Sequence, residues 1–224
     1  MTAKGLLIIG NGEIASMAFE YFTHDSVYDV AAFAIGQDYI KTETFEDRPL
    51  VPLDQAAGLY PPGEFDAFVA IGDTQLNRVR RRQVDWCKAE GYRLASYVSS
   101  RAFVWRNVTI GENCFVLEHN VLQPFVTIGD NVTLWSGNHI GHRSVVEDDV
   151  FMASHVVVSG FCRVGHSSFV GVNAAIANGV EVAADNFIGM GAMITRSTEE
   201  DSIYMGNPAE RRDLSAKRYC RVKA

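Results

Sequence analysis

Aliphatic residues recur every six positions through the second half of the chain. From Val104 to Ile194, every sixth residue is Val, Ile, Leu or Met. An α-helix repeats every 3.6 residues and a β-strand every two, so neither element alone produces a six-residue period. A hexapeptide repeat is typical of a parallel β-helix, in which each hexad supplies one short strand. The positions are Val104, Ile110, Val116, Leu122, Ile128, Leu134, Ile140, Val146, Met152, Val158, Val164, Val170, Ile176, Val182, Ile188 and Ile194.

A second series of positions, four residues after the aliphatic ones, holds only small or medium side chains. Side chains of this size fit where a chain turns tightly and its interior narrows. We therefore expect them to point inward near the turns of the β-helix. Members of this series include Val108, Cys114, Asn120, Ser144, Ala174 and Ala192.

The first hundred residues follow a different pattern, in which short apolar runs alternate with helical spacing. Residues 5–22 read as a strand, a glycine turn and a helix, and residues 74–90 read as a long helix. Further strands are predicted around Gly36, around Pro49 to Pro52, before Gly72, and over 92–98. Strands that alternate with helices favour a small parallel α/β domain, whose ligands bind beyond the carboxyl ends of the strands. We predict this domain over residues 1–100 and a β-helix with a C-terminal tail over residues 101–224.

Charge and composition exclude several classes of binding partner. A net charge of −7 and a pI near 5.3 argue against nucleic acid and against anionic membrane surfaces. No apolar run reaches the length of a membrane span, and the N-terminus lacks the layout of a signal peptide, so we expect a cytoplasmic protein. The basic cluster Arg78, Arg80, Arg81 and Arg82 is interpreted as a solvated helix face rather than a phosphate site. The four cysteines show no metal-binding spacing, and Cys114 and Cys162, which fall on the small inward positions of the hexads, are interpreted as core thiols in a reducing cytoplasm.

The hexads "IGENCF", "IGDNVT" and "VGHSSF" resemble those of the left-handed β-helix acyltransferases. With the glycine turn "GNGE", the segment "AIGDTQLNRVRRR" and the closing "SIYMGNPAERR", nearly the whole chain resembles the sialic-acid O-acetyltransferase and bacillosamine N-acetyltransferase family. The resemblance implies three hexads per coil, so that residues eighteen apart stack. Asn120 and Asn138 are then expected to bond to each other inside the coil. It also implies a homotrimer that takes acetyl-CoA as co-substrate, uses no metal, and binds a nucleotide-linked sugar through Gly10, Asn11, Gly12, Gly72 and Gln75.

The same resemblance selects His142, third residue of the hexad "IGHRSV", as general base. A neutral imidazole there takes a proton from a sugar amine or hydroxyl as it attacks a thioester. The family places Glu or Asp after this histidine, whereas Arg143 follows here. An acid partner must therefore come from elsewhere, and Glu118, Glu147 and Asp148 are all candidates. His155 is predicted as a second site residue.

The ungapped alignment with the family also indicates where the acyl donor lies. Phe151, Val172 and Met190 are expected to line the path of coenzyme A between neighbouring β-helices. In the tail, Arg211 and Arg212 are candidates to meet its phosphates. Trp105 and Trp135 occupy outward positions, where they are expected to pack between subunits or under the amino-terminal domain.

We therefore predict an acetyl-CoA-dependent N-acetyltransferase that acts on a 4-amino-4,6-dideoxy sugar linked to a nucleotide, for bacterial surface glycans such as lipopolysaccharide or capsule. Sugar O-acylation is the first alternative. A second is a γ-type carbonic anhydrase, because His119 and His155 fall two coils apart on one column, although Gly160 occupies the place of the third zinc ligand. A non-catalytic β-helix binding module is the third.

Overall fold

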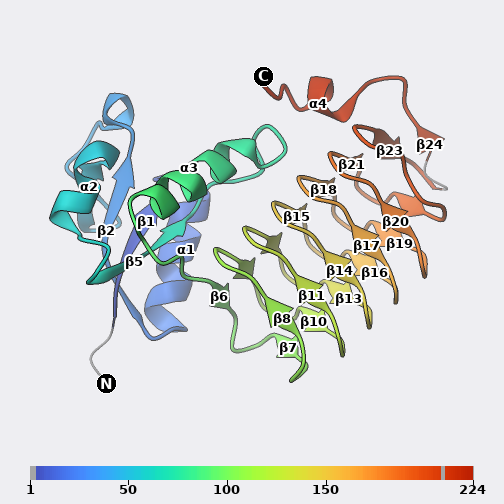
Figure 1. Ribbon diagram of the computed structural model, residues 1–224, viewed down its shortest axis with the longest axis horizontal. Helices are drawn as coiled ribbons and strands as arrows, with labels where there is room; N and C mark the ends of the chain where they lie inside the picture. The colour runs from blue at the N-terminus through green and yellow to red at the C-terminus, as the bar shows by residue number, and fades with distance from the viewer. Residues whose placement is uncertain (1–3, 208–209, 224) are drawn as a thin grey trace. The chain divides into compact units, whose positions relative to one another are not determined.

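The computed structural model describes residues 4–207 and 210–223, and the chain divides into two compact units (Figure 1). The first unit comprises residues 1–72 and 80–97, and the second comprises residues 73–79 and 98–224. The short segment Asp73–Val79 thus belongs to the second unit although it precedes α3 (Arg78–Ala89), the last helix before the β-helix.

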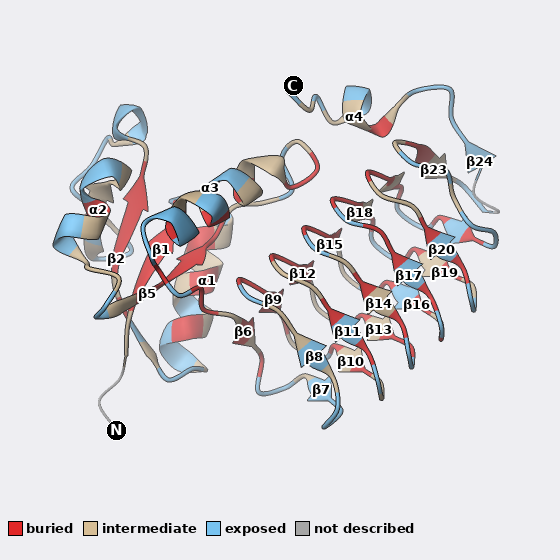
Figure 2. Ribbon diagram, in the orientation of Figure 1, coloured by how far each residue is buried: buried red, intermediate tan, exposed pale blue. Residues whose placement is uncertain are grey.

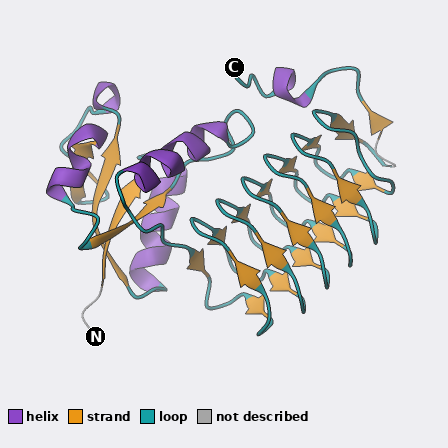
Figure 3. Ribbon diagram, in the orientation of Figure 1, coloured by secondary structure: helices purple, strands orange, loops and turns teal. Residues whose placement is uncertain are grey.

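The first unit is built on a five-stranded sheet with the strand order β3-β4-β2-β1-β5. All neighbours pair in parallel except the short β3–β4 pair. The central strands are almost continuously apolar and buried, as expected for parallel strands covered on both faces. The elements are β1 (Lys4–Ile9), α1 (Glu13–His24), β2 (Tyr28–Ile35), a 3₁₀ turn (Gln37–Tyr39), β3 (Thr44–Phe45), β4 (Arg48–Pro52), α2 (Leu53–Leu59), β5 (Phe65–Val69) and α3 (Figure 3).

Four details of this unit differ from the sequence prediction. The helix expected from residue 74 begins at Arg78, because the three residues Gln75 to Asn77 take left-handed backbone angles that no α-helix tolerates. The expected strand over 92–98 is divided between two sheets: Leu94 forms a single bridge with Ala67, and Tyr97–Val98 form β6, which pairs within the β-helix. Helix α2 was not expected. Arg80, assigned to a solvated face, is buried.

The second unit is a parallel β-helix with three flat faces. Two-residue strands follow one another every six residues, and each pairs in parallel with the strand eighteen residues later. Face 1 has the order β7-β10-β13-β16-β19-β22, face 2 has β8-β11-β14-β17-β20, and face 3 begins β6-β9-β12-β15-β18-β21 and continues into β23 and β24. The strands are β6 (Tyr97–Val98), β7 (Phe103–Val104), β8 (Thr109–Ile110), β9 (Phe115–Val116), β10 (Val121–Leu122), β11 (Thr127–Ile128), β12 (Thr133–Leu134), β13 (His139–Ile140), β14 (Val145–Val146), β15 (Phe151–Met152), β16 (Val157–Val158), β17 (Arg163–Val164), β18 (Phe169–Val170), β19 (Ala175–Ile176), β20 (Glu181–Val182), β21 (Phe187–Ile188), β22 (Met193–Ile194), β23 (Ile203–Met205) and β24 (Glu210–Arg211).

The aliphatic series predicted from the sequence forms the interior of this β-helix. From Val116 to Ile194 every member is buried, so the red positions recur once per strand along the coil in Figure 2. The first two members, Val104 and Ile110, are less covered because they lie in the first coil. Burial of one such side chain contributes about 1.5–3 kcal/mol, so a regular column of them stabilises each coil against the next.

The interior asparagines bond differently from the prediction. Asn120 donates to the backbone carbonyls of Leu117, Leu134 and Trp135, and Asn138 donates to Trp135, so the expected Asn120–Asn138 ladder was wrong. Backbone carbonyls near the turns are thus the partners of these amides, in place of the amide in the next coil.

A side-chain ladder does form one turn away, at positions that take left-handed backbone angles. Asn113 donates to Asn131 over 2.9 Å, and Asn131 donates to Asp149 over 2.7 Å.

After the last coil the chain folds back through β23 and β24 to α4 (Ala216–Tyr219). Ile203 and Ala216 form a small core with Leu76 of the 73–79 segment. Within the described residues, the helices are all too short or too polar to cross a membrane.

Candidate functional site

The β-helix has three corners, and the predicted base lies at one of them. We call the turns between face 1 and face 2 the His142 corner; it comprises residues 105–108, 123–126, 141–144, 159–162 and 177–180. From Asn113 to Gly191, the third residue after each aliphatic position takes a left-handed backbone angle. At the other two corners these residues are Asn, Asp, His, Ser or Gly. At the His142 corner three of them are Phe125, Arg143 and Phe161.

Bulky residues avoid the left-handed region, so three of them in one column is unusual. Strained backbone of this kind gathers at functional sites, where the side chains are needed for something other than the turn. The column therefore marks the His142 corner as different from the other two, independently of any histidine.

The His142 side chain is exposed to solvent and held on three sides. Its backbone N–H donates to Gln123 Oε1 over 2.9 Å, and its ring Nδ1 lies 3.3 Å from the same oxygen. The Phe161 ring meets the imidazole edge-on, with 4.9 Å between ring centroids. A Cβ on Gly160 would lie only 2.5 Å from the imidazole, so a glycine is required there for the ring to take this place.

Gln123 and Gly160 were not predicted from the sequence. Both positions could be derived from the period of eighteen residues per coil. Gly160 lies eighteen residues after His142, and Gln123 lies nineteen residues before it. A search along the column for the nearest neighbours of His142 would have found them.

None of the three predicted acid partners contacts His142. Glu118 accepts a hydrogen bond from Ser136, Asp148 from the backbone of Asp130, and Glu147 from the backbone of His166. Glu147 also pairs with Arg163. The imidazole thus takes a neutral amide as its partner in place of a carboxylate.

Arg143 follows His142 directly in the same turn. Its guanidinium stacks over the ring of Phe125, 4.4 Å from the centroid. In the part of the chain that the structure describes, Arg143 has no carboxylate within ion-pair distance. An exposed cation therefore lies directly beside the candidate base.

The other histidines lie elsewhere on the coil. His119 and His155 occupy the corner between face 3 and face 1, with Gly137 between them, and both take left-handed angles. The structure does not bring His155 to the His142 corner. His139 lies on face 1, in the strand that leads into His142. Among the described residues, no group of three or more His, Cys, Asp or Glu side chains is arranged to hold a metal ion.

A groove runs along the β-helix where face 3 meets the His155 corner. Its volume is about 390 Å³, and Val172 and Met190 both line it, whereas Phe151 lies behind it. The rings of Phe151, Phe169 and Phe187 stack along face 3 with interplanar angles of 12° and 11°. The remaining lining is Ala153, Phe169, Gly171, Phe187, Gly189, Met205 and Tyr219. Small residues at the turn and stacked rings on the face thus line an apolar groove.

The tail residue Arg211 lies in β24 and is exposed. It pairs with Glu199 over 3.2 Å and donates to the hydroxyl of Ser202. Its guanidinium is thus fixed near the end of the last coil.

In the first unit, the predicted glycine residues follow the carboxyl ends of parallel strands. Gly10 follows β1 with φ of +130°, and a Cβ there would lie 2.6 Å from the carbonyl oxygen of Ala70. Asn11 is exposed and Gly12 caps the N-terminus of α1, so the first turn of this helix presents backbone N–H groups. Gly72 follows β5.

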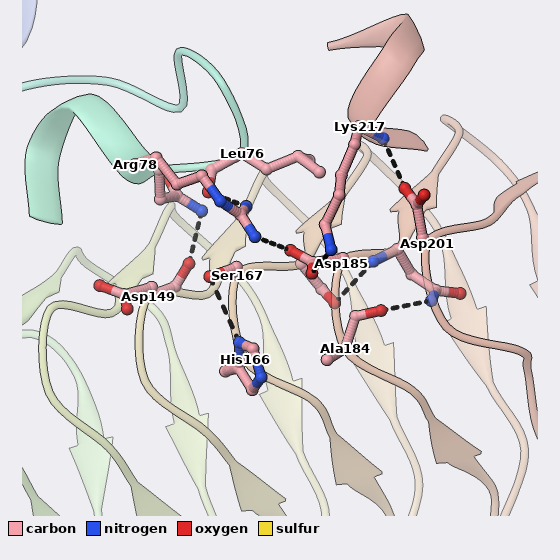
Figure 4. Close-up of polar contacts among 12 residues, drawn as sticks. Leu76, Arg78, Asp149, His166, Ser167, Ala184, Asp185, Asp201 and Lys217 are labelled. Carbon is pink, nitrogen blue, oxygen red and sulfur yellow. Dashed lines mark hydrogen bonds and ion pairs between the residues drawn. The ribbon is translucent and has the colours of Figure 1, made fainter. Parts of the chain in front are cut away.

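Gln75 lies in the second unit, in the 73–79 segment. Its side-chain Oε1 is buried and has no hydrogen-bond partner among the described residues. Around it the segment is fixed to the β-helix, as Figure 4 shows. Asn77 donates to the carbonyl of Asp149 over 2.5 Å, and Arg78 pairs with the buried carboxylate of Asp185. Lys217 of α4 pairs with the same carboxylate over 2.7 Å.

Comparison with known proteins supports this reading of the repeat. Residues 107–142 match the family model described as bacterial transferase hexapeptide (six repeats). An acyl-[acyl-carrier-protein]–UDP-N-acetylglucosamine O-acyltransferase from Stutzerimonas stutzeri is 28% identical over 111 residues. The match covers 44% of this chain and 43% of that protein, so the chain spans less than half the length of this curated relative.

Solved structures match across both units. A perosamine N-acetyltransferase from Caulobacter crescentus, solved with CoA and GDP-perosamine, is 25% identical with a TM-score of 0.84, over 94% of this chain and 97% of that one. The acetyltransferase domain of PglB from Neisseria gonorrhoeae is 22% identical with a TM-score of 0.82, over 93% and 99% of the two chains. The predicted fold, a small α/β parallel-sheet domain followed by a left-handed parallel β-helix, is confirmed.

Proposed function

Because this chain belongs to the hexapeptide-repeat transferases, we propose that it transfers an acyl group from coenzyme A to the amino group of a nucleotide-linked sugar. The observation that carries the proposal is the fixed imidazole of His142 on the same fold as an enzyme solved with CoA and GDP-perosamine. A 4-amino-4,6-dideoxy sugar is the acceptor that we propose, and acetyl-CoA is the donor.

The chemistry needs one base at His142. The sugar amine attacks the thioester carbonyl, a C–N bond forms, and the tetrahedral intermediate expels the coenzyme A thiolate as the C–S bond breaks. Nε2 of His142 takes the proton that the nitrogen loses, and that proton leaves with the thiol. Positioning of both substrates at the imidazole supplies the rest of the rate.

The two substrates are assigned to different parts of the chain. Asn11, Gly12 and Gly72 offer backbone N–H groups beyond the carboxyl ends of the strands, which suit the phosphates of a nucleotide. Gly10, whose own N–H donates to Ala34, allows the chain to pass close to Ala70 at this edge. In the second unit, the buried acceptor of Gln75 suits a donor group on a substrate, because an unpaired buried oxygen costs about 1–3 kcal/mol. On the donor side, Val172 and Met190 line a channel for the pantetheine arm, with Phe151 behind it and Arg211 for a coenzyme phosphate.

A homotrimer is part of this proposal. Face 1 carries exposed Phe103, Val157 and Met193, beside exposed Trp105, and this apolar surface suits a second copy of the chain. Neighbouring β-helices then enclose the donor groove, and the enzyme works in the cytoplasm on precursors of surface glycans such as lipopolysaccharide or capsule.

The test is thiol release from acetyl-CoA, followed by mass spectrometry, with a panel of GDP-, UDP- and dTDP-linked 4-amino sugars. We expect a mass gain of one acetyl group on one amino sugar and a loss of at least a hundredfold in kcat for His142→Ala. Transfer to a hydroxyl sugar only would establish O-acylation. Transfer from an acyl carrier protein only would change the donor. Transfer unaffected by His142→Ala would remove His142 as base, and no transfer with any pair would leave a non-catalytic binding module.

A further inference from the structure

Gln123 determines which nitrogen of His142 can accept a proton. The backbone N–H of His142 can only donate, so the Gln123 atom 2.9 Å away must be the carbonyl oxygen Oε1 rather than the amide nitrogen. The same oxygen lies 3.3 Å from ring Nδ1. An amide oxygen only accepts, so Nδ1 carries the hydrogen and the lone pair of the neutral ring lies on Nε2.

We propose that Gln123 is the positioning residue of the His142 base. This inference rests on the proposed function, since it assigns a role within the same reaction. Gln123 fixes the tautomer and the plane of the imidazole through one atom that bonds both the backbone and the ring. Nε2 is left as the atom that takes the proton from the acceptor.

The coil geometry explains how one side chain reaches both groups. Gln123 stands directly over Gly141 in the next coil, as its backbone N–H donates to the carbonyl of Ile140. Since Gly141 has no side chain, the amide of Gln123 extends across it to His142. The chain uses the same arrangement at Glu147, which reaches over Gly165 to the backbone N–H of His166 at 2.9 Å. At the His142 corner an amide replaces that carboxylate.

The amide differs from a carboxylate in charge. When the ring takes a proton, Gln123 supplies no negative charge to stabilise the imidazolium. The charged groups nearest in the fold are Arg143 on the same turn, Arg106 two coils earlier on the same corner, and His139 on the preceding strand. None of these is an acid. Gln123 therefore orients the base without placing a negative charge beside it.

Gln123→Leu and Gln123→Glu separate orientation from charge. We expect Gln123→Leu to lower kcat by about tenfold to a hundredfold while KM for both substrates changes by less than threefold. Gln123→Glu should retain activity, since its carboxylate accepts the same two hydrogen bonds. The acidic limb of its kcat/KM profile should move to higher pH by roughly half a unit or more, because a negative charge favours the protonated ring.

Asn107→Ala is the matched control. Asn107 Oδ1 accepts from the backbone N–H of Phe125 over 3.0 Å, at the same corner and one coil earlier, without touching His142. It should lose a similar amount of stability and keep kcat. Gln123→Leu with kcat within twofold of the wild type, or Gln123→Glu with an unmoved acidic limb, would overturn the proposal.

A second readout does not depend on activity. In protein carrying ¹⁵N-labelled histidine, the His142 ring should show the Nδ1–H tautomer in the wild type and a mixture of tautomers in Gln123→Leu. An Nε2–H tautomer in the wild type would refute the positioning role. If the protein transfers no acyl group at all, this measurement still decides whether Gln123 holds the ring, so the two failures are distinguishable.

Discussion

The carboxylate of Asp185 lies 2.5 Å from the guanidinium of Arg78, although the two residues are 107 positions apart in the sequence. Asp185 comes from the last full coil, is almost completely buried, and also pairs with Lys217 of α4. One carboxylate thus fixes both the 73–79 segment that carries Gln75 and the C-terminal helix to the β-helix.

Replacement of Asp185 should destabilise the second unit. Asp185→Ala leaves two cations without their partner, and loss of one member of a buried pair typically costs 3–5 kcal/mol. The side chains of Arg78 and Lys217 are 25% and 39% exposed, so solvent screens part of each ion pair. We therefore expect a smaller loss in the free energy of unfolding, about 2–3 kcal/mol. Thermal unfolding measures it. Asp213→Ala, an exposed residue of the same tail, should leave Tm unchanged; an equal Tm for Asp185→Ala would contradict the role of this carboxylate.

The contribution of Lys217 should depend on pH in a defined direction. A hydrogen bond to Asp185 raises the pKa of Lys217 above its usual 10.5, so the folded chain holds this proton more tightly than the unfolded chain. The resulting stabilisation is complete below about pH 10.5 and disappears as the pH rises through the raised value. The Tm difference between wild type and Lys217→Met should therefore be constant from pH 7 to 10 and shrink above that. A difference that grows toward high pH would mean that the ion pair is not its source.

Gly160→Ala should lower activity without lowering the stability of the fold. The new Cβ would fall 2.5–2.9 Å from three atoms of the His142 ring and must displace it, whereas Gly160 has no left-handed angle that alanine would strain. We expect kcat to fall at least tenfold, because small misplacements of a catalytic group have large effects, with Tm within a few degrees of wild type. Gly171→Ala is the contrast, since its Cβ would meet the backbone nitrogen of Met190 at 2.6 Å and should lower Tm. Full activity in Gly160→Ala would place the reaction away from this ring.

The hexapeptide period predicted the β-helix, its interior and the column on which His142 lies, because a six-residue repeat leaves few other folds. The period says nothing about which polar neighbour a side chain chooses once the coils stack. Asn120 was expected to bond Asn138, and instead donates to three backbone carbonyls, those of Leu117, Leu134 and Trp135. Likewise Gln123 was overlooked, because its role depends on the absence of a side chain at Gly141.

In the first unit the apolar runs located the parallel strands, and the errors fell where backbone conformation overrode propensity. Residues 75–77 have side chains compatible with a helix but adopt left-handed angles, since Leu76 is buried against Ile203 and Ala216. Such long-range packing is not visible in a local pattern.

The cysteines should react slowly, as expected for core thiols. Burial raises the pKa of the Cys87 thiol to about 12 and that of Cys220 to about 11, and Cys114 and Cys162 are buried. Iodoacetamide should therefore label native protein at Cys220 first, since Cys220 alone of the four is partly exposed. The rate should rise about tenfold per pH unit between pH 8 and 10, following the thiolate fraction. Cys220→Ser should abolish this first labelling reaction. Rapid labelling of Cys220 at pH 7.5 would show that the tail opens in solution.

Arg143 offers a test of acceptor specificity. Its guanidinium is held over Phe125 beside the base, and the structure gives it no carboxylate partner among the described residues. A cation fixed in this way suits a negatively charged group on the acceptor sugar or on the acyl group. Arg143→Ala should then lower kcat/KM for acceptors that carry a carboxylate by roughly tenfold more than for neutral ones, a difference of about 1.4 kcal/mol. Because residue 143 takes a left-handed angle, Arg143→Asn, which tolerates that angle, controls for backbone strain. Equal losses for charged and neutral substrates in both variants would show that Arg143 supports the turn and does not select the substrate.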